Sequence, residues 1–319
     1  MRLFPLAMDW DGSLIPQTLL CDRLGLIVPL GTTGEALRVW AEKECLREVR
    51  AQWALLHEQH RLPWLAFLGS GDFHHMTLAL LEALPADQRP STLVVIDNHP
   101  DWFLESPPYH CGNWVGTALQ TLKWLKQVIL IGVDSRDLRG TRFWRAPWAD
   151  LCRGRLRVYP YRISKVTIPF RRCTPGSPAA SARKTWRGVE WTFPTLLGGG
   201  VVRTFQDLAR ELHNEPVYLS IDKDCLRSDE LNTDWDQGAL RSDELLAGVR
   251  CLSAAVRFCG VDICGERAPH LLRDWSKRVD TGRWRPFASR SMAQDYKPHE
   301  RLNLALWDAL GLDAKEPIP

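Results

Sequence analysis

The sequence carries a compact set of metal-ligand side chains at the end of an apolar run. Asp97, His99 and Asp101 follow directly on Thr92–Ile96. Because side chains alternate along an extended chain, these three project to one side and converge. Carboxylates that share a site raise each other's pKa, and a bound divalent cation removes the repulsion between them. Mostly oxygen ligands with an imidazole suit Mn²⁺ better than a thiolate-seeking metal.

Two further segments supply groups of the same kind. Asp222 and Asp224 follow the apolar run Pro216–Ile221, again at alternate positions. The glycine-rich segment Gly69–His75 follows a third apolar run and ends in two histidines, one or both of which could contribute an imidazole. A single cluster of this kind is usually a hydrogen-bonded loop. Three clusters at successive strand ends favour a metal site.

The apolar runs before these motifs are typical of strands buried on both faces of a parallel sheet. The expected strands are 64–68, 92–96, 127–133, 216–221 and 255–261, the last leading into Asp262. Helical patterns separate them, and the expected helices are 34–60, 76–84, 115–125, 204–213 and 241–252. This alternation predicts an α/β fold of three layers, with a mostly parallel central sheet and helices on both faces. Ligands of such sheets bind at the carboxyl ends of the strands, where the acidic motifs lie.

The chain of 319 residues is long enough for one large α/β domain, and residues 1–319 are expected to form a single domain. A basic stretch at about 135–190 differs in character and is expected to be irregular or inserted structure within that domain. Solvated surface is its simplest interpretation. A pocket rim that binds an anionic substrate group is the alternative.

Composition narrows the class of protein further. The net charge of +3 gives no indication of a nucleic-acid partner. No apolar run approaches the ~18 residues of a membrane-spanning helix. The nine scattered cysteines include no CxxC pair, which fits a reduced, cytoplasmic protein. A small-molecule substrate is the expected partner.

These motifs resemble those of the ureohydrolases, the family of arginase, agmatinase and formimidoylglutamase. The family sequences G-G-D-H-S, D-A-H-x-D and S-x-D-x-D-x-x-D-P appear here as Gly69–Thr77, Asp97–Asp101 and Ser220–Leu226. The resemblance spans about residues 68–268 and implies an arginase-like fold, two Mn²⁺ ions per chain and homo-oligomers. The ligands that it implies are His74, Asp97, His99, Asp101, Asp222 and Asp224, with His75 as the alternative to His74.

The resemblance also implies hydrolysis of a linear amidine or guanidino compound by a hydroxide that bridges the two metal ions. Asp101 would orient the water and shuttle a proton. Asn113 matches a residue that binds the substrate's amino-acid end, and Glu266, one position late, matches one that binds the guanidinium. Val115 replaces a histidine used for proton transfer, and His110 nearby is the candidate substitute.

Two other functions remain open. Gly71–His75 partly resembles the G-G-x-H-H sequence of deacetylases, which would be amidohydrolases with a single zinc ion. The loss of a proton-transfer histidine at Val115 would instead leave a metal-binding module without activity. Metal content and released products distinguish these hypotheses.

Overall fold

The centre of the protein is an eight-stranded sheet, seen in a computed structural model that describes residues 3–29, 31–104, 107, 109–168, 176, 180–268, 272–282 and 292–312. All strand pairings in this sheet are parallel. In spatial order the strands are β2 (Leu26–Pro29), β1 (Phe4–Asp9), β3 (Trp64–Phe67), β11 (Arg257–Cys264), β10 (Pro216–Asp222), β4 (Thr92–Ile96), β5 (Gln127–Ile131) and β6 (Leu156–Tyr159).

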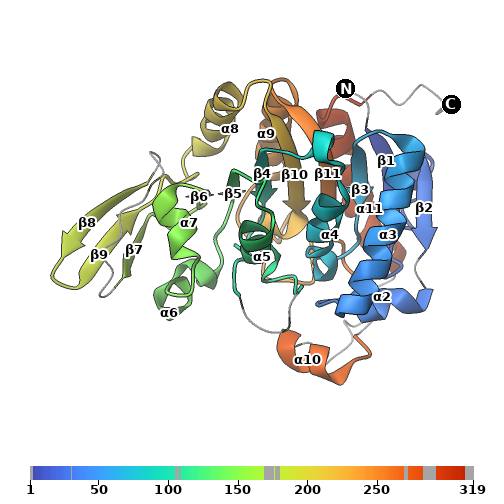
Figure 1. The fold of residues 1–319 in the computed structure, drawn as a ribbon, viewed down its shortest axis with the longest axis horizontal. Coiled ribbons are helices and arrows are strands. Elements are labelled where there is room, and N and C mark those ends of the chain that lie inside the picture. The colour runs from blue at the N-terminus through green and yellow to red at the C-terminus, as the bar shows by residue number, and fades with distance from the viewer. Residues whose placement is uncertain are drawn as a thin grey trace.

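Helices cover both faces of the sheet, so that the predicted three-layer α/β architecture is confirmed (Figure 1). Successive residues of one strand enter opposite cores: Ala66 packs in one, and Leu65 and Phe67 in the other. This burial on both faces explains why the strands are nearly continuous in apolar residues. One core contains α3 (Lys43–His60), α4 (Met76–Ala83) and α5 (Trp114–Thr121), and the other α8 (Gly200–Glu211), α9 (Ser242–Ser253) and α11 (Met292–Ala309).

Short helices connect these layers or close their ends. They are α1 (Thr18–Cys21), α2 (Gly31–Leu37), α6 (Gly140–Phe143), α7 (Trp148–Arg153) and α10 (Trp275–Thr281), with the 3₁₀ turns η1 (Gly71–Phe73), η2 (Ala86–Gln88), η3 (Arg136–Leu138) and η4 (Lys223–Cys225). None of the helices in the described part of the chain is long and apolar enough to cross a membrane.

Four adjacent strands in the middle of the sheet, β3, β11, β10 and β4, carry the predicted motifs. The strand expected at 255–261 is β11, which begins and ends later than predicted. Asp262 therefore lies within the strand instead of following it. The sequence patterns did not identify β1, β2 or β6.

The prediction of a single helix over 34–60 is wrong, because two helices, α2 and α3, occupy this region and residues 38–42 between them are not helical. Val39 has a φ of 67°, its N–H donates to the Asp72 carbonyl at 2.8 Å, and its carbonyl accepts from the Cys111 N–H at 2.8 Å. Arg38 adds a buried ion pair with Asp72, with Nε and Oδ2 2.7 Å apart. Hydrogen bonds to distant segments therefore replace the helical ones at this point.

Regular elements occupy much of the basic stretch at 135–190, where irregular or inserted structure was expected. Its strand β6 belongs to the central sheet, and a small antiparallel sheet in the order β7 (Lys165–Ile168), β9 (Gly188–Thr192) and β8 (Ser181–Thr185) projects at one side (Figure 1). Several of its arginines form ion pairs, such as Arg155 with Asp150 at 2.6 Å. The high positive charge of this stretch is thus partly neutralised.

Seven described cysteines are free: Cys21, Cys45, Cys111, Cys225, Cys251, Cys259 and Cys264. Cys152 is disulfide-bonded, and its partner lies outside the described residues. This disulfide differs from the expectation of fully reduced cysteines, and the cytoplasmic location stays a prediction.

Candidate metal centre

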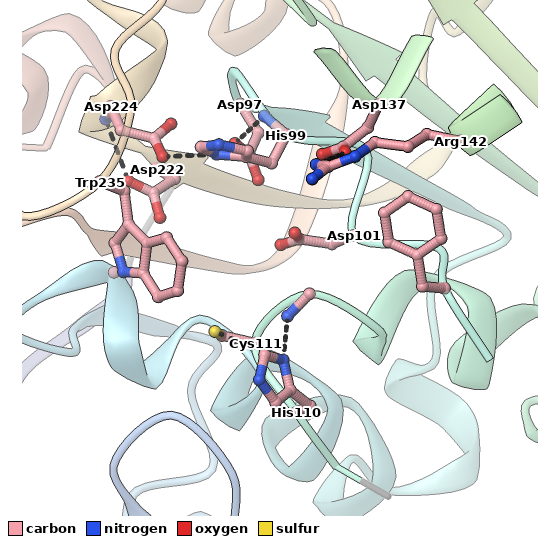
Figure 2. A pocket seen from close by; sticks show the side chains of 13 residues that line it. Asp97, His99, Asp101, His110, Cys111, Asp137, Arg142, Asp222, Asp224 and Trp235 are labelled. Carbon is pink, nitrogen blue, oxygen red and sulfur yellow. Dashed lines mark hydrogen bonds and ion pairs between the residues drawn. The ribbon is translucent and has the colours of Figure 1, made fainter. Parts of the chain in front are cut away.

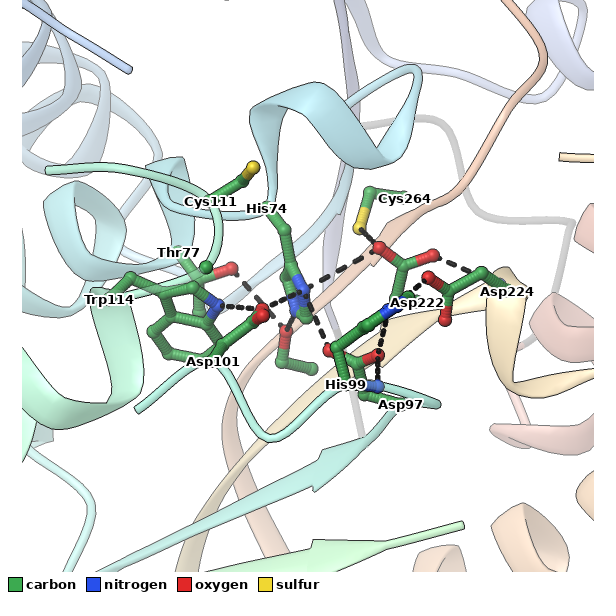
Figure 3. A network of polar contacts seen from close by, with 12 residues as sticks. His74, Thr77, Asp97, His99, Asp101, Cys111, Trp114, Asp222, Asp224 and Cys264 are labelled. Carbon is green, nitrogen blue, oxygen red and sulfur yellow. Dashed lines mark hydrogen bonds and ion pairs between the residues drawn. The ribbon is translucent and has the colours of Figure 1, made fainter. Parts of the chain in front are cut away.

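The six predicted ligands lie together at the carboxyl edge of the central sheet (Figures 2 and 3). Asp97 is the first residue after β4, and Asp222 is the last residue of β10. The turn η1, which follows β3, delivers His74 to the same edge. Parallel neighbours end at one edge of a sheet, which is why segments more than a hundred residues apart meet here.

His74 is the centre of the first ligand group. Its Nδ1 lies 3.1 Å from Asp101 Oδ2, 3.2 Å from Asp97 Oδ2 and 3.6 Å from Asp222 Oδ2. All four side chains are buried. His75, the alternative, is also buried but does not join these carboxylates, and burial lowers its pKa to about 3.

His99 is the centre of the second group. Its Nδ1 lies 2.8 Å from Asp224 Oδ2 and 3.7 Å from Asp97 Oδ1. Asp97 therefore presents one carboxylate oxygen to each imidazole. A carboxylate divided in this way is suited to bridge two cations.

The donor atoms fit a pair of divalent cations. His74 Nδ1 and Asp97 Oδ2 are buried and lack a hydrogen-bond partner of good geometry among the described residues. Burial, followed by the charge of Asp97, raises the pKa of Asp101 to about 7. Burial, followed by the charges of Asp222 and Asp97, raises the pKa of Asp224 well above its ordinary value. Positive charge between these carboxylates would relieve both the repulsion and the missing contacts.

A second layer of side chains fixes the orientation of His74. The hydroxyl of Ser220 donates to Asp262 Oδ1 at 2.6 Å and lies 2.9 Å from His74 Nε2. Thr77 donates to the same Asp262 oxygen at 3.1 Å. Since the Ser220 proton is used on Asp262, Ser220 accepts from His74 Nε2–H, so Nδ1 is the nitrogen that can bind a metal once the imidazole is neutral. The sequence motif around Asp262 was visible, but this supporting role was not predicted.

Asp101 has a strained backbone at the centre of the site. Its φ is 45°, a left-handed conformation that is uncommon for residues other than glycine. The Trp114 indole donates to Asp101 Oδ2 at 2.9 Å, and the Val115 N–H donates to the Asp101 carbonyl at 2.9 Å. These contacts from α5 hold the Asp101 carboxylate toward His74.

A pocket of about 140 Å³ opens over the ligands (Figure 2). Besides four aspartates and His99 of the two groups, its walls include Phe103, His110, Cys111, Asp137, Arg142 and Trp235. Arg142 Nη1 pairs with Asp137 Oδ1 at 2.8 Å. One arginine of the basic stretch thus lies on the pocket wall, where it is paired with Asp137, and binding of an anionic substrate group by this stretch stays a prediction.

His110 reaches the pocket, but hydrogen bonds engage both of its ring nitrogens. Nδ1 accepts from the Gly112 N–H at 2.8 Å, so that Nε2 carries the proton and donates to Asp280 Oδ2 at 2.7 Å. Asn113 does not line the pocket, because its amide bonds to the backbone of His110 and Pro107. The positions of His110 and Asn113 therefore do not support the roles that the resemblance implied.

Glu266 also lies outside the pocket lining. Its carboxylate is fully buried and forms an ion pair with Lys223. Gln17 donates to Glu266 Oε2 at 2.9 Å, Asn303 donates to Oε1 at 2.8 Å, and His299 Nδ1 lies 3.0 Å from Oε2. With these partners Glu266 has no oxygen directed at a substrate, so the expected guanidinium contact is not present.

Lys223 is a further residue that sequence reasoning missed. It stands between Asp222 and Asp224 in the sequence, begins the turn η4, and forms a buried ion pair with Glu266. A lysine between two predicted ligand aspartates was the available signal, since such a side chain needs a carboxylate partner when buried.

Comparison with solved structures shows that the eight-stranded parallel sheet and its flanking helices form an arginase-like fold. The agmatine ureohydrolase of Thermoplasma volcanium is similar over 97% of this chain and 90% of its own, with a TM-score of 0.57 and 12% identity. Arginase from Bacillus subtilis matches over 98% and 99%, with a TM-score of 0.57 and 14% identity. The proclavaminate amidino hydrolase of Streptomyces clavuligerus matches over 91% and 77%, with a TM-score of 0.52 and 18% identity.

Comparison of the sequence with known sequences and family models gives one partial match. No family model matches the chain. An uncharacterized protein of Thermotoga maritima is 28% identical over 205 residues, which are 64% of this chain and 59% of that protein. The match thus spans less than two thirds of that relative's length.

Proposed function

We propose that this protein is a hydrolase of the ureohydrolase kind that cleaves a C–N bond in a linear amidine or guanidino compound with a pair of Mn²⁺ ions. The observation that carries the proposal is that one carboxylate oxygen of Asp97 faces His74 and the other faces His99. Supporting it are the arginase fold and the unsatisfied buried donor atoms of the site.

The residues of the chain have distinct tasks in this proposal. When bound, the metal pair supplies a water molecule that ionises near neutral pH. His74, His99 and the four aspartates would hold that pair, and Asp101, one of the four, would also orient the attacking water. Water adds to the amidine carbon, the C–N bond breaks, and Asp101 passes the proton to the departing amine. His110 has no task in this scheme, because both of its nitrogens are engaged.

The test combines metal analysis with a substrate panel. Mass spectrometry of the protein as purified and after Mn²⁺ loading is expected to find two Mn²⁺ per chain. A panel of guanidines, amidines and acylated amines is then assayed for urea, formamide, ammonia and acetate. Release of acetate by a protein with one zinc ion would establish the deacetylase alternative, and a fully loaded protein without turnover would establish the binding module.

A matched pair of variants makes the assay specific. Asp101→Asn removes the orienting carboxylate and is expected to lower turnover by about 100-fold or more, the contribution of a general acid or base. Asp229→Asn alters an exposed aspartate that does not line the pocket and is expected to retain full turnover. Assembly into homo-oligomers belongs to the same proposal, and light scattering measures it directly.

A further inference from the structure

A guanidinium or amidinium group needs a binding surface here other than Glu266. Glu266 is paired with Lys223 outside the pocket lining, and Asp137, which lines the pocket, is paired with Arg142. The remaining carboxylates of the described pocket lining are the predicted metal ligands. No uncommitted carboxylate among the described lining residues is therefore left for a bidentate contact with the substrate cation.

We propose that Trp235 binds the flat cationic group of the substrate by stacking on its indole ring. This inference rests on the proposed function, since it assigns the substrate-recognition residue of that same site. A cation over the face of a tryptophan is attracted by the negative potential of the ring, and this attraction strengthens in a site from which water is excluded. The substrate class is thus a planar cation, a guanidinium or amidinium carried on a linear chain.

The position of Trp235 fits this role. It lines the pocket beside Asp222, with its ring centroid 6.2 Å from that of His99 at an angle of 71° (Figure 2). Gly71 lies against the indole, and a Cβ at that position would be 3.0 Å from Trp235 Cδ1 and 2.9 Å from Asp222 Oδ2. A side chain at position 71 would therefore enter the space between the indole and the ligands.

Two buried residues fix the ring in place. The indole Nε1 donates to Asp72 Oδ1 at 2.9 Å, and the other Asp72 oxygen pairs with Arg38 Nε at 2.7 Å. Both Asp72 and Arg38 are buried. Because the indole N–H is used on Asp72, Trp235 offers the pocket a ring rather than a donor. A ring that is already fixed loses little conformational freedom when a ligand stacks on it.

The test measures binding rather than turnover, with n-butylguanidinium and its neutral isostere n-butylurea as probes. Isothermal titration of each into Mn²⁺-loaded wild type, Trp235→Phe and Trp235→Leu gives the preference for the cation. We expect Trp235→Leu to weaken the guanidinium about ten-fold while the urea changes little, and Trp235→Phe to lie between them. Trp186→Leu, which alters a tryptophan exposed in the β8–β9 turn, is expected to bind both probes as wild type does.

Equal losses for both probes in Trp235→Leu would overturn the proposal, since the ring would then only fill space. Equal affinities of the two probes for the wild type would overturn it without any variant, which covers the case of an unstable Trp235→Leu protein. Absence of turnover with every substrate refutes the proposed hydrolase but leaves this binding comparison intact. The two ideas can therefore fail separately.

Discussion

At the scale of single residues, Asp97 is the point on which both ligand groups depend. Its Oδ2 lies 3.2 Å from His74 Nδ1 and its Oδ1 lies 3.7 Å from His99 Nδ1. Asp101 contacts only the His74 group. The two aspartates belong to one short motif, yet they have different structural consequences for the site.

Replacement of these residues should separate the two metal positions. Asp97→Ala is expected to lose both metal ions, because each site loses an oxygen and the bridge between them is gone. Asp101→Ala is expected to lose only the ion beside His74. Elemental analysis after gel filtration in metal-free buffer gives the stoichiometry, and two ions per chain in Asp97→Ala would contradict the ligand assignment.

Asp262 contacts Ser220, which contacts His74, so Asp262 would support a metal bound at His74. Asp262→Asn keeps the shape of the side chain but removes the negative charge that orients Ser220. Metal affinity is expected to fall about 10- to 100-fold, the usual effect of a residue that supports a ligand histidine. Competition with a fluorescent chelator measures the affinity, and Asp87→Asn in the exposed turn η2 is the control. Unchanged affinity would show that Ser220 orients His74 unaided.

The sequence predicted the ligands better than their surroundings. Asp97, His99, Asp101, Asp222 and Asp224 could be found because each motif lies at the end of an apolar run, which is a local property of the chain. The alternation of an extended chain does not continue through the motifs, since Asp101 has a φ of 45° and Asp224 lies in the turn η4. The contacts of Glu266 could not be predicted from the sequence, since Gln17 and Asn303 come from opposite ends of the chain and their proximity depends on tertiary packing. For the same reason the pairing of His110 with Asp280 was not predictable.

At the scale of elements, the ends of neighbouring strands must approach each other closely to assemble the site. Gly265 follows β11 with a φ of 90°. A Cβ at this position would lie 2.5 Å from Asp222 Oδ1 and 2.6 Å from the backbone nitrogen of Lys223. The central strands were predicted because they are apolar throughout. The break at Val39 was not, because the apolar pattern of 34–60 continues through it and the competing hydrogen bonds come from Asp72 and Cys111.

Gly265→Ala tests this close approach. The strain of a left-handed conformation costs about 1–2 kcal/mol for an alanine, and contact with Asp222 adds displacement of a metal ligand. Gly198→Ala is a matched control, because its φ is 71° and no atom lies within 4 Å of the added Cβ. Urea denaturation is expected to show losses in both variants, and chelator competition is expected to show weaker metal binding in Gly265→Ala alone. Equal metal affinities would mean that the β11 end moves without disturbing Asp222.

At the scale of the whole molecule, the Glu266 cluster joins the two ends of the chain to the centre of the sheet. Gln17 lies in the N-terminal region, Asn303 and His299 lie on α11, and Lys223 follows β10. The three-layer architecture was predictable from the alternation of strands and helices. The connection between the termini was not, because it depends on polar residues without a sequence pattern.

The cluster should give the protein a characteristic sensitivity to acid. Burial alone would raise the pKa of Glu266, but the charges of Lys223 and His299 outweigh it and lower the pKa to about 2. A depressed carboxyl pKa contributes stability that is complete above the ordinary value of 4.5 and is lost as the pH falls toward 2. The full contribution is about 3 kcal/mol.

Glu266→Gln removes this titration. The variant is expected to lose about 3–5 kcal/mol at neutral pH, because Lys223 remains buried without its partner, and to depend less on pH below 4.5. Denaturant titrations between pH 3 and 7 measure the free energy of unfolding, with exposed Glu58→Gln as the control. Parallel pH profiles for wild type and Glu266→Gln would place the acid sensitivity elsewhere.

The strand order sets when the site can form during synthesis. β10 and β11 lie in the sheet between β3 and β4, although the ribosome makes them more than a hundred residues later. Until they emerge, β3 and β4 have no neighbour on the sides that will face each other. Asp222 and Asp224 are likewise absent while His74, Asp97 and Asp101 already exist. The nascent chain therefore lacks two of the six predicted ligands until Asp224 has left the exit tunnel, and β3 keeps an unpaired edge until β11, which ends at Cys264, has followed.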